Sequence, residues 1–342
     1  MVRTMSYLRS LIGTARRLRP GPPSPAGLSC DTEVLLDVPD ERLGPALVAA
    51  ANGEYEPAAK LLATTREAAE WEDRDRYTAR LAAFTLSRED WLAEWLAAAP
   101  YDPDARLLKA ELAVLQAWDS PARAERLREV GPLIDAAADG DPRDPVPWRI
   151  ALDHARGVHT PHTDFEKLWE QALRRSSRHY GCHVAALQYL SAQWYGSHRE
   201  CFDFAEQAAD DALPSSLIQA LPVRAAFAYL ISGGRLPVAR ERIDEAADRA
   251  IALSASFGPG NTWQAEIRNL LVYVLVSRER WAEAVEQFRL IGPDVTSFPW
   301  AQLSDDPLGR FLELRYAALR SADSGRGPRG RPERSRVNGH YA

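Results

Sequence analysis

Residues 179–209, HYGCHVAALQYLSAQWYGSHRECFDFAEQAA, decide the fold, because they read as a helix, a turn and a second helix. Gly196 stands where the first helix has to end, since glycine readily takes the backbone conformations that close a helix. After the turn, Cys201 and Ala205 continue a small, apolar helix face. The stretch therefore predicts a hairpin of two closely packed helices.

The same turn pattern recurs at four places. A Gly or polar residue is followed by a large side chain that would anchor the second helix, a small one that would let the helices approach, and an apolar one. The copies are Gly53-x-Tyr55-x-x-Ala58-x-x-x-Leu62, Gly196-x-His198-x-x-Cys201-x-x-x-Ala205, Gly234-x-Leu236-x-x-Ala239-x-x-x-Ile243 and Glu279-x-Trp281-x-x-Ala284-x-x-x-Phe288.

This pattern resembles the turn and second helix of the tetratricopeptide repeat. The small residues of the last three copies are 38 and 45 positions apart, a longer spacing than the family's, and Leu271-Val272 stand where the family has Leu-Gly. The middle of the chain also resembles actinobacterial proteins of this helical type. The resemblance implies an all-α, tetratricopeptide-like α-solenoid of antiparallel helix pairs. The alternative is an irregular all-α bundle.

Composition agrees with a helical chain. Of 342 residues, 46% are hydrophobic and 26% charged, which suffices for one long helical array or two domains. Abundant Ala, Leu, Glu and Arg favour helices, and no sheet is expected. Arginine supplies all but three of the 42 basic residues, which is typical of a GC-rich bacterial genome.

Helices are predicted from apolar periodicity and from start signals such as Asp102-Pro103. Residues 291–306 are predicted to form an irregular excursion before a final capping helix. The predicted helices span residues 41–52, 54–69, 72–85, 88–99, 103–117, 121–138, 146–156, 163–175, 179–194, 199–211, 215–232, 236–253, 262–277, 281–290 and 307–320.

Three segments are expected. Residues 1–30 form a basic N-terminal arm and Pro-rich linker, residues 31–320 the helical repeat domain, and residues 321–342 a disordered basic tail. The arm carries charge +5 and the tail +3, so the net charge of −6 leaves −14 on the body. An acidic body argues against a nucleic-acid groove. The amphipathic segment of residues 1–19 could contact a membrane surface.

Three cysteines without CxxC spacing favour a reducing compartment, and no apolar run is long enough to span a bilayer. A cytoplasmic location is therefore predicted.

Six of the seven histidines lie between residues 154 and 198, which invites a metal site with Cys182 and Cys201. Hairpin geometry puts His179 and His183 at the end away from the turn, where Asp210 and Asp211 could join them. The candidate ligands at the turn end are His154, His159, His162, His198 and Cys201.

The repeat offers a simpler interpretation of these residues. His198 takes the anchor position and Cys201 the small one, while His179 and His183 become cap or surface residues. A pH-responsive interface is a further alternative.

Catalytic motifs are scarce. The sequence has no G-x-S-x-G elbow, HExxH or P-loop, and its single G-x-G-x-x-G, at residues 325–330, lies in the tail without a preceding strand. Trp91 and Trp95 share a helix face that is either core or part of a groove for a peptide.

The sequence therefore predicts an adaptor or scaffold for protein–protein interaction rather than an enzyme. Such an adaptor would bind a partner protein or peptide on a concave helical face. No cofactor is predicted. One alternative is a metal-binding enzyme or sensor that uses the histidines of residues 154–201. The other is a peripheral membrane protein held by residues 1–19.

Overall fold

The computed structural model describes residues 28–233, 238–258 and 262–325, and this part of the chain is all-α apart from two strands of two residues each. The all-α part of the predicted fold class is thus confirmed. The α-helices are α2 (Leu43–Ala51), α3 (Glu56–Glu67), α4 (Trp71–Thr85), α5 (Asp90–Ala98), α6 (Pro103–Trp118), α7 (Arg123–Ala138), α8 (Val146–Gly157), α9 (His162–Arg175), α10 (Tyr180–Tyr189), α11 (His198–Asp210), α12 (Leu221–Ile231), α13 (Arg240–Ala255), α14 (Thr262–Ser277), α15 (Trp281–Ile291), α16 (Ser297–Trp300) and α17 (Pro307–Gly325).

The start of α6 shows how local sequence fixes a helix. Asp102 precedes Pro103, and its carboxylate accepts the backbone N–H groups of Asp104 and Ala105 at 2.9 and 3.0 Å. These donors have no partner inside the helix, and proline fits its first position. The predicted start is confirmed.

The first helix of the hairpin at residues 179–209 is shorter than predicted. It ends at Tyr189 rather than at residue 194, and the chain turns through residues 190–196. A Cβ atom on Gly196 would lie 2.2 Å from the carbonyl oxygen of Leu190. Gly196 is therefore needed because the backbone passes close to Leu190 there. It does not end the helix, which stops more than one turn earlier, at Tyr189.

Other turns use a left-handed residue. Gly53 and Glu279, the first residues of two copies of the repeat pattern, have φ angles of 90° and 60°. Ala69 before α4 and His159 before α9 take the same conformation, with φ of 55° and 63°. Neither of these two turns belongs to a copy of the repeat pattern.

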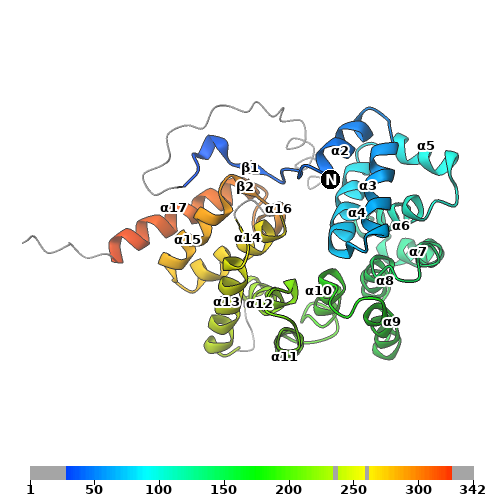
Figure 1. Cartoon of the computed structure of the whole chain (residues 1–342). Helices are drawn as coiled ribbons and strands as arrows, with labels where there is room; N and C mark the ends of the chain where they lie inside the picture. Colours follow the sequence, from blue (N-terminus) through cyan, green and yellow to red (C-terminus); the bar gives the residue numbers. More distant parts are fainter. Residues whose placement is uncertain (1–27, 234–237, 259–261, 326–342) are drawn as a thin grey trace, which may run out of the picture.

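The helices follow a curved path, and each packs mainly on the next one or two in the chain. Figure 1 shows α2–α4 on one side and α13–α17 on the other, joined by the path through α7–α12. The inner side of this path is where segments distant in sequence approach one another.

A strap, residues 28–41, joins the two sides. It contains the 3₁₀-helix η1 (Asp31–Glu33) and strand β1 (Leu35–Leu36), which pairs in parallel with β2 (Asp294–Val295). Asp37 lies 3.2 Å from Arg80 of α4 and accepts the backbone N–H of Ser297 in α16 at 2.9 Å.

The strap and the last helix correct the predicted boundaries. Residues 291–306 contain β2 and α16, so the prediction of an irregular segment without a strand is wrong there. Leu28 is 4% exposed in the C-terminal core, so the folded domain starts before residue 31. Helix α17 reaches Gly325, five residues into the predicted tail. Residues 1–27 and 326–342 lie outside the described residues.

Candidate functional site

The small residues of the repeat pattern are buried in three of its four copies. Ala58 and Ala284 are 0% exposed and Cys201 is 2% exposed. The Cys201 thiol lies 3.3 Å from the carbonyl oxygen of Leu190, across the turn between α10 and α11. Burial raises its pKa to about 12, so Cys201 is a small protonated side chain between two helices.

The large residues of the pattern lie half-buried at helix starts. Tyr55 stacks on Trp95 with ring centroids 5.9 Å apart, and His198 meets Tyr229 edge-on at 5.2 Å. Trp281, the first residue of α15, packs against the C-terminal core. These contacts fit an anchoring role for all three side chains.

The third copy differs. Helix α13 begins at Arg240, so Ala239 precedes the helix and is exposed rather than held between two helices. The prediction for Ala239 is therefore wrong, because the helix starts four residues later than expected. Leu236 lies outside the described residues.

The histidines of residues 154–198 do not converge. His154 Nε2 lies 2.6 Å from the Leu127 carbonyl oxygen, and His198 Nε2 lies 2.9 Å from the Ser232 hydroxyl. His159 hydrogen-bonds to Tyr195, while His162 stacks on Tyr189. Across the described residues, no three His, Cys, Asp or Glu side chains are grouped so that they could hold a metal ion.

His179 and His183 are both buried, at 1% and 6% exposure, so neither is a surface residue. His179 does cap α10, because its Nδ1 accepts the backbone N–H of Cys182 at 3.2 Å. His183 Nδ1 donates to the His179 carbonyl oxygen at 2.9 Å, and its ring lies edge-on to Trp169. Burial lowers the pKa of His183 to about 4, so its ring is neutral near pH 7.

The metal site predicted at the end of the hairpin away from the turn, with His179, His183, Asp210 and Asp211, is also not formed. Asp210 lies 2.5 Å from Arg249, and Asp211 accepts from Gln207 at 3.0 Å. Both carboxylates thus bind partners near the end of α11 rather than His179 or His183.

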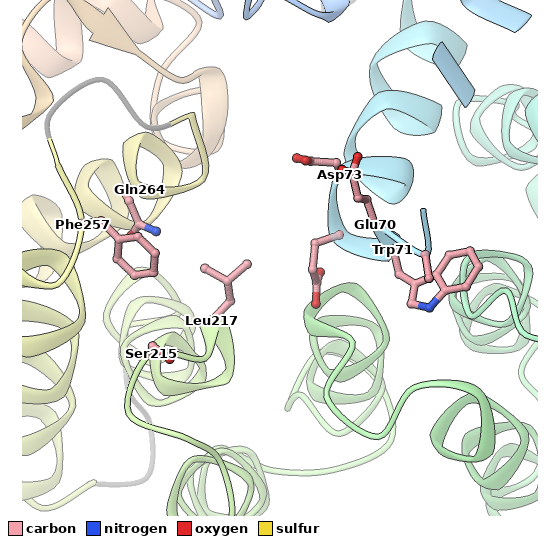
Figure 2. Close-up of a pocket in the computed structure, with 9 residues that line it drawn as sticks. Glu70, Trp71, Asp73, Ser215, Leu217, Phe257 and Gln264 are labelled. Carbon is pink, nitrogen blue, oxygen red and sulfur yellow. The ribbon is translucent and has the colours of Figure 1, made fainter. Parts of the chain in front are cut away.

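The most promising site is a pocket of about 400 Å³ on the inner side of the helical path, which we call the inner pocket. Figure 2 shows its two walls, with Glu70 and Asp73 on one side and Leu217, Phe257 and Gln264 on the other. The first wall is the start of α4. The second comes from η2 (Leu217–Ala220) and Ser215 before it, from Phe257 after α13, and from Gln264 in the first turn of α14. Its lining residues are Ala69, Glu70, Trp71, Glu72, Asp73, Ser215, Leu217, Phe257 and Gln264.

Glu72 ties the acidic wall to α10. Its Oε1 accepts the backbone N–H of Tyr180 at 2.8 Å. Its Oε2 is buried, has no hydrogen-bond partner among the described residues, and lies 3.8 Å from His179 Nε2. Burial raises the pKa of the Glu72 carboxyl above its usual range, although His179 and the Tyr180 N–H oppose that shift. Glu72 Oε2 therefore accepts no hydrogen bond within the described residues.

Gln264 is the unusual residue of the opposite wall. Its side chain is 1% exposed, yet neither its amide nitrogen nor its amide oxygen has a hydrogen-bond partner within the described part of the chain. A buried amide without partners costs roughly 1–3 kcal/mol per group. Such a group therefore marks a place where a ligand would gain hydrogen bonds.

Two buried arginines lie behind the acidic wall. Arg74 of α4, 1% exposed, lies 2.7 Å from Asp104 and 2.6 Å from Asp144, and it also donates to the Leu62 carbonyl at 2.9 Å. These contacts join α4 to α6 and to the start of α8. They fix the direction in which α4 presents its first turn to the inner pocket.

Arg149 of α8 likewise joins its helix to α4 and α6 through carboxylates. Its guanidinium lies 2.7 Å from Asp75 and 2.8 Å from Glu111. Burial raises the pKa of Glu111, and the Arg149 charge opposes that shift. A single cation thus holds two buried carboxylates from two other helices.

Cys182, His179 and a carboxylate form an arrangement that resembles a catalytic triad. The Cys182 thiol lies 3.2 Å from His179 Nδ1, and His179 Nε2 lies 3.8 Å from both Glu72 and Asp75. Yet Cys182 is 0% exposed, and burial raises its thiol pKa well above the usual range. A protonated, sealed thiol cannot attack a substrate, so this group is structural.

Sequence reasoning missed the inner pocket. Residues 69–73 form one wall, and Ser215, Leu217, Phe257 and Gln264 form the other, and only the curvature of the path brings them together. The one local signal was the acidic turn Glu70–Asp73, and acids at a helix start are ordinary because they favour the helix dipole.

Searches for related proteins found no match among protein-family models, curated proteins or solved structures. In the part of the chain that the structure describes, no helix has the length and apolar character needed to cross a membrane. Residues 1–19, which carry the membrane-surface alternative, lie outside it.

Proposed function

We propose that this protein is an adaptor or scaffold that binds a segment of a partner protein on the concave side of a tetratricopeptide-like α-solenoid. The inner pocket supports the proposal best, because it faces the inner side of the helical path and combines acidic with apolar walls. Sites between helices that combine apolar surface with a few polar groups are typical ligand sites.

The solenoid part of the proposal rests on two further observations. Successive helices contact their neighbours along the chain, as in repeat proteins. Small buried side chains follow the turn in three copies of the pattern, at Ala58, Cys201 and Ala284. We therefore propose that the helices form antiparallel pairs with the hairpin geometry that the sequence predicts.

Binding is favoured over catalysis because the thiol–imidazole–carboxylate group at Cys182 is sealed from solvent. The proposal keeps a cytoplasmic location, since Cys30, Cys182 and Cys201 are all free.

Site-specific photocrosslinking in cells tests the proposal. A photoreactive phenylalanine analogue would replace Ser215, an exposed residue at the inner pocket, in the 342-residue chain. The matched control places it at Tyr101, which is 82% exposed and outside the pocket. We expect a discrete crosslinked protein from the Ser215 position only. Identical products from both positions, or none from Ser215, would contradict the proposal.

A further inference from the structure

We propose that the inner pocket binds an arginine side chain within an extended segment of the partner, between Glu72 and Gln264. This inference rests on the proposed adaptor function and specifies the chemistry of its partner. The first observation is the negative charge of the pocket. Three carboxylates, Glu70, Glu72 and Asp73, line the pocket, and none of its described lining residues is basic. Glu70 is already 2.7 Å from Arg42, whereas Glu72 has a buried oxygen that accepts no hydrogen bond within the described residues.

Acids alone would not identify a site, since Glu72 and Asp73 stand in the first turn of α4, where acids stabilise a helix. Gln264 is the independent observation, because it belongs to the other wall and has no part in capping α4. Its amide is 1% exposed and unpaired within the described residues. Figure 2 places it beside Phe257, on the wall opposite Glu70 and Asp73.

The unpaired atoms specify the ligand. Glu72 Oε2 and Gln264 Oε1 are acceptors, and Gln264 Nε2 is a donor. A guanidinium carries five N–H donors in a planar fork, more than the two acceptors require. A peptide carbonyl beside that arginine would accept from Gln264 Nε2. An arginine in a peptide therefore satisfies all three atoms, whereas a free amine leaves the amide nitrogen unpaired.

The apolar part of the pocket favours arginine over lysine. Leu217 and Phe257 line the wall that carries Gln264. Guanidinium groups stack on aromatic rings and are more weakly hydrated than ammonium groups. The chain itself uses this contact, with Arg224 4.4 Å from the Phe298 ring centroid and Arg175 4.1 Å from that of Trp148. The volume of about 400 Å³ lies within the range of ordinary ligand sites.

Two heptapeptides test the inference with the 342-residue protein. One is Gly-Ser-Ala-Arg-Ala-Ser-Gly, and the other replaces arginine by citrulline, which has the same shape without the charge. Calorimetric titration should show binding of the arginine peptide that is about tenfold tighter than that of the citrulline peptide. A lysine peptide should bind more weakly than the arginine peptide. Equal affinity for the arginine and citrulline peptides, or for the arginine and lysine peptides, would overturn the inference.

Variants locate the binding. Glu72→Gln keeps an acceptor for the Tyr180 N–H, and Gln264→Leu keeps the volume, so each should fold and bind about tenfold more weakly. Ser215→Trp should block the pocket from an exposed position. The control Glu170→Gln removes a 64% exposed carboxylate outside the pocket and should bind as the parent does. Unchanged binding by Glu72→Gln, Gln264→Leu and Ser215→Trp would overturn the inference.

The basic arm of the same chain is the rival occupant. Replacing Arg3, Arg9, Arg16, Arg17 and Arg19 by glutamine removes its charge. If only that variant bound the peptide, the arm would occupy the pocket, and a partner segment would be excluded as its occupant. If no peptide bound while the Ser215 crosslink persisted, the arginine inference would fail and the adaptor function would stand.

Discussion

The helices before α10 and those after it are stabilised in different ways. The first region divides its apolar side chains among three separate clusters, and buried Arg74 and Arg149 join the helices through carboxylates. The second region has one continuous apolar cluster. Its buried Arg268 donates to the Ser254 and Phe257 carbonyl oxygens, both at 2.9 Å. We therefore expect the stability of the first region to depend more on charge and pH. The stability of the second, where buried Arg315 also pairs with Asp31, should depend more on side-chain volume.

The largest expected effect comes from Arg149→Met. It leaves Asp75 and Glu111 buried without their cation, which should cost about 3–5 kcal/mol at pH 7. Burial raises the pKa of the Glu111 carboxyl and Arg149 opposes that shift, so without Arg149 the folded Glu111 binds a proton more tightly and the loss should shrink as pH falls. Denaturant titration at pH 7 and pH 5 measures both effects.

Arg268→Met is the matched comparison in the second region. It also removes a buried guanidinium but leaves carbonyl oxygens, which do not titrate, so it should cost about 1–3 kcal/mol at both pH values. If Arg149→Met lost no more at pH 7 than at pH 5, the two regions would not differ in the way we describe.

A further pH dependence of stability should come from His183, in α10 between the two regions. Its folded pKa of about 4 lies below the unfolded value of 6.5, so the folded state prefers the neutral ring. That contribution is complete above pH 6.5 and is lost as pH falls toward 4, by about 3 kcal/mol at most. His183→Phe keeps an aromatic ring beside Trp169 and should lose less stability than the parent between pH 6.5 and 4. Parallel curves for the two proteins would refute this assignment.

In the second region, Ala284→Leu should cost about 1–3 kcal/mol, because Ala284 is 0% exposed where α15 packs on α14. Ala239→Leu provides the control from the same repeat position. Since Ala239 is exposed, its replacement should stay within about 0.5 kcal/mol. Thermal unfolding of both variants measures the two changes in stability. Equal losses of stability would show that Ala239 is packed between two helices, as the repeat pattern predicts.

The smallest effect is a gain at two turns, one in each region. Glu279→Gly and Ala69→Gly should each stabilise the protein by about 0.5–1 kcal/mol, because both residues hold a positive φ that glycine adopts freely. Gly53→Ala, at φ 90°, should do the reverse. A loss of stability in Glu279→Gly would show that the side chain matters more than the backbone there.

Local sequence signals predicted most of the helices. Apolar spacing and start signals predicted the helices, and α14 spans the predicted residues 262–277. Where prediction erred, tertiary contacts decided the outcome. The end of α10 depends on the close return at Gly196, and the burial of His179 and His183 depends on neighbouring helices.

The inner pocket was beyond prediction for the same reason. Glu72 and Gln264 are 192 residues apart, and neither has a distinctive sequence context. Their significance comes from unpaired atoms on two walls, which only a three-dimensional arrangement can reveal.

The strap limits how this chain can change in length. An open array of hairpins can gain or lose a pair, since each pair touches only its neighbours. Here Asp37 binds both Arg80 and Ser297, so residues 28–41 have to reach from one end of the path to the other. A further helix pair would displace an end by about 10 Å per helix, and the strap extends by at most about 3.6 Å per residue. The number of helices and the length of the strap must therefore change together.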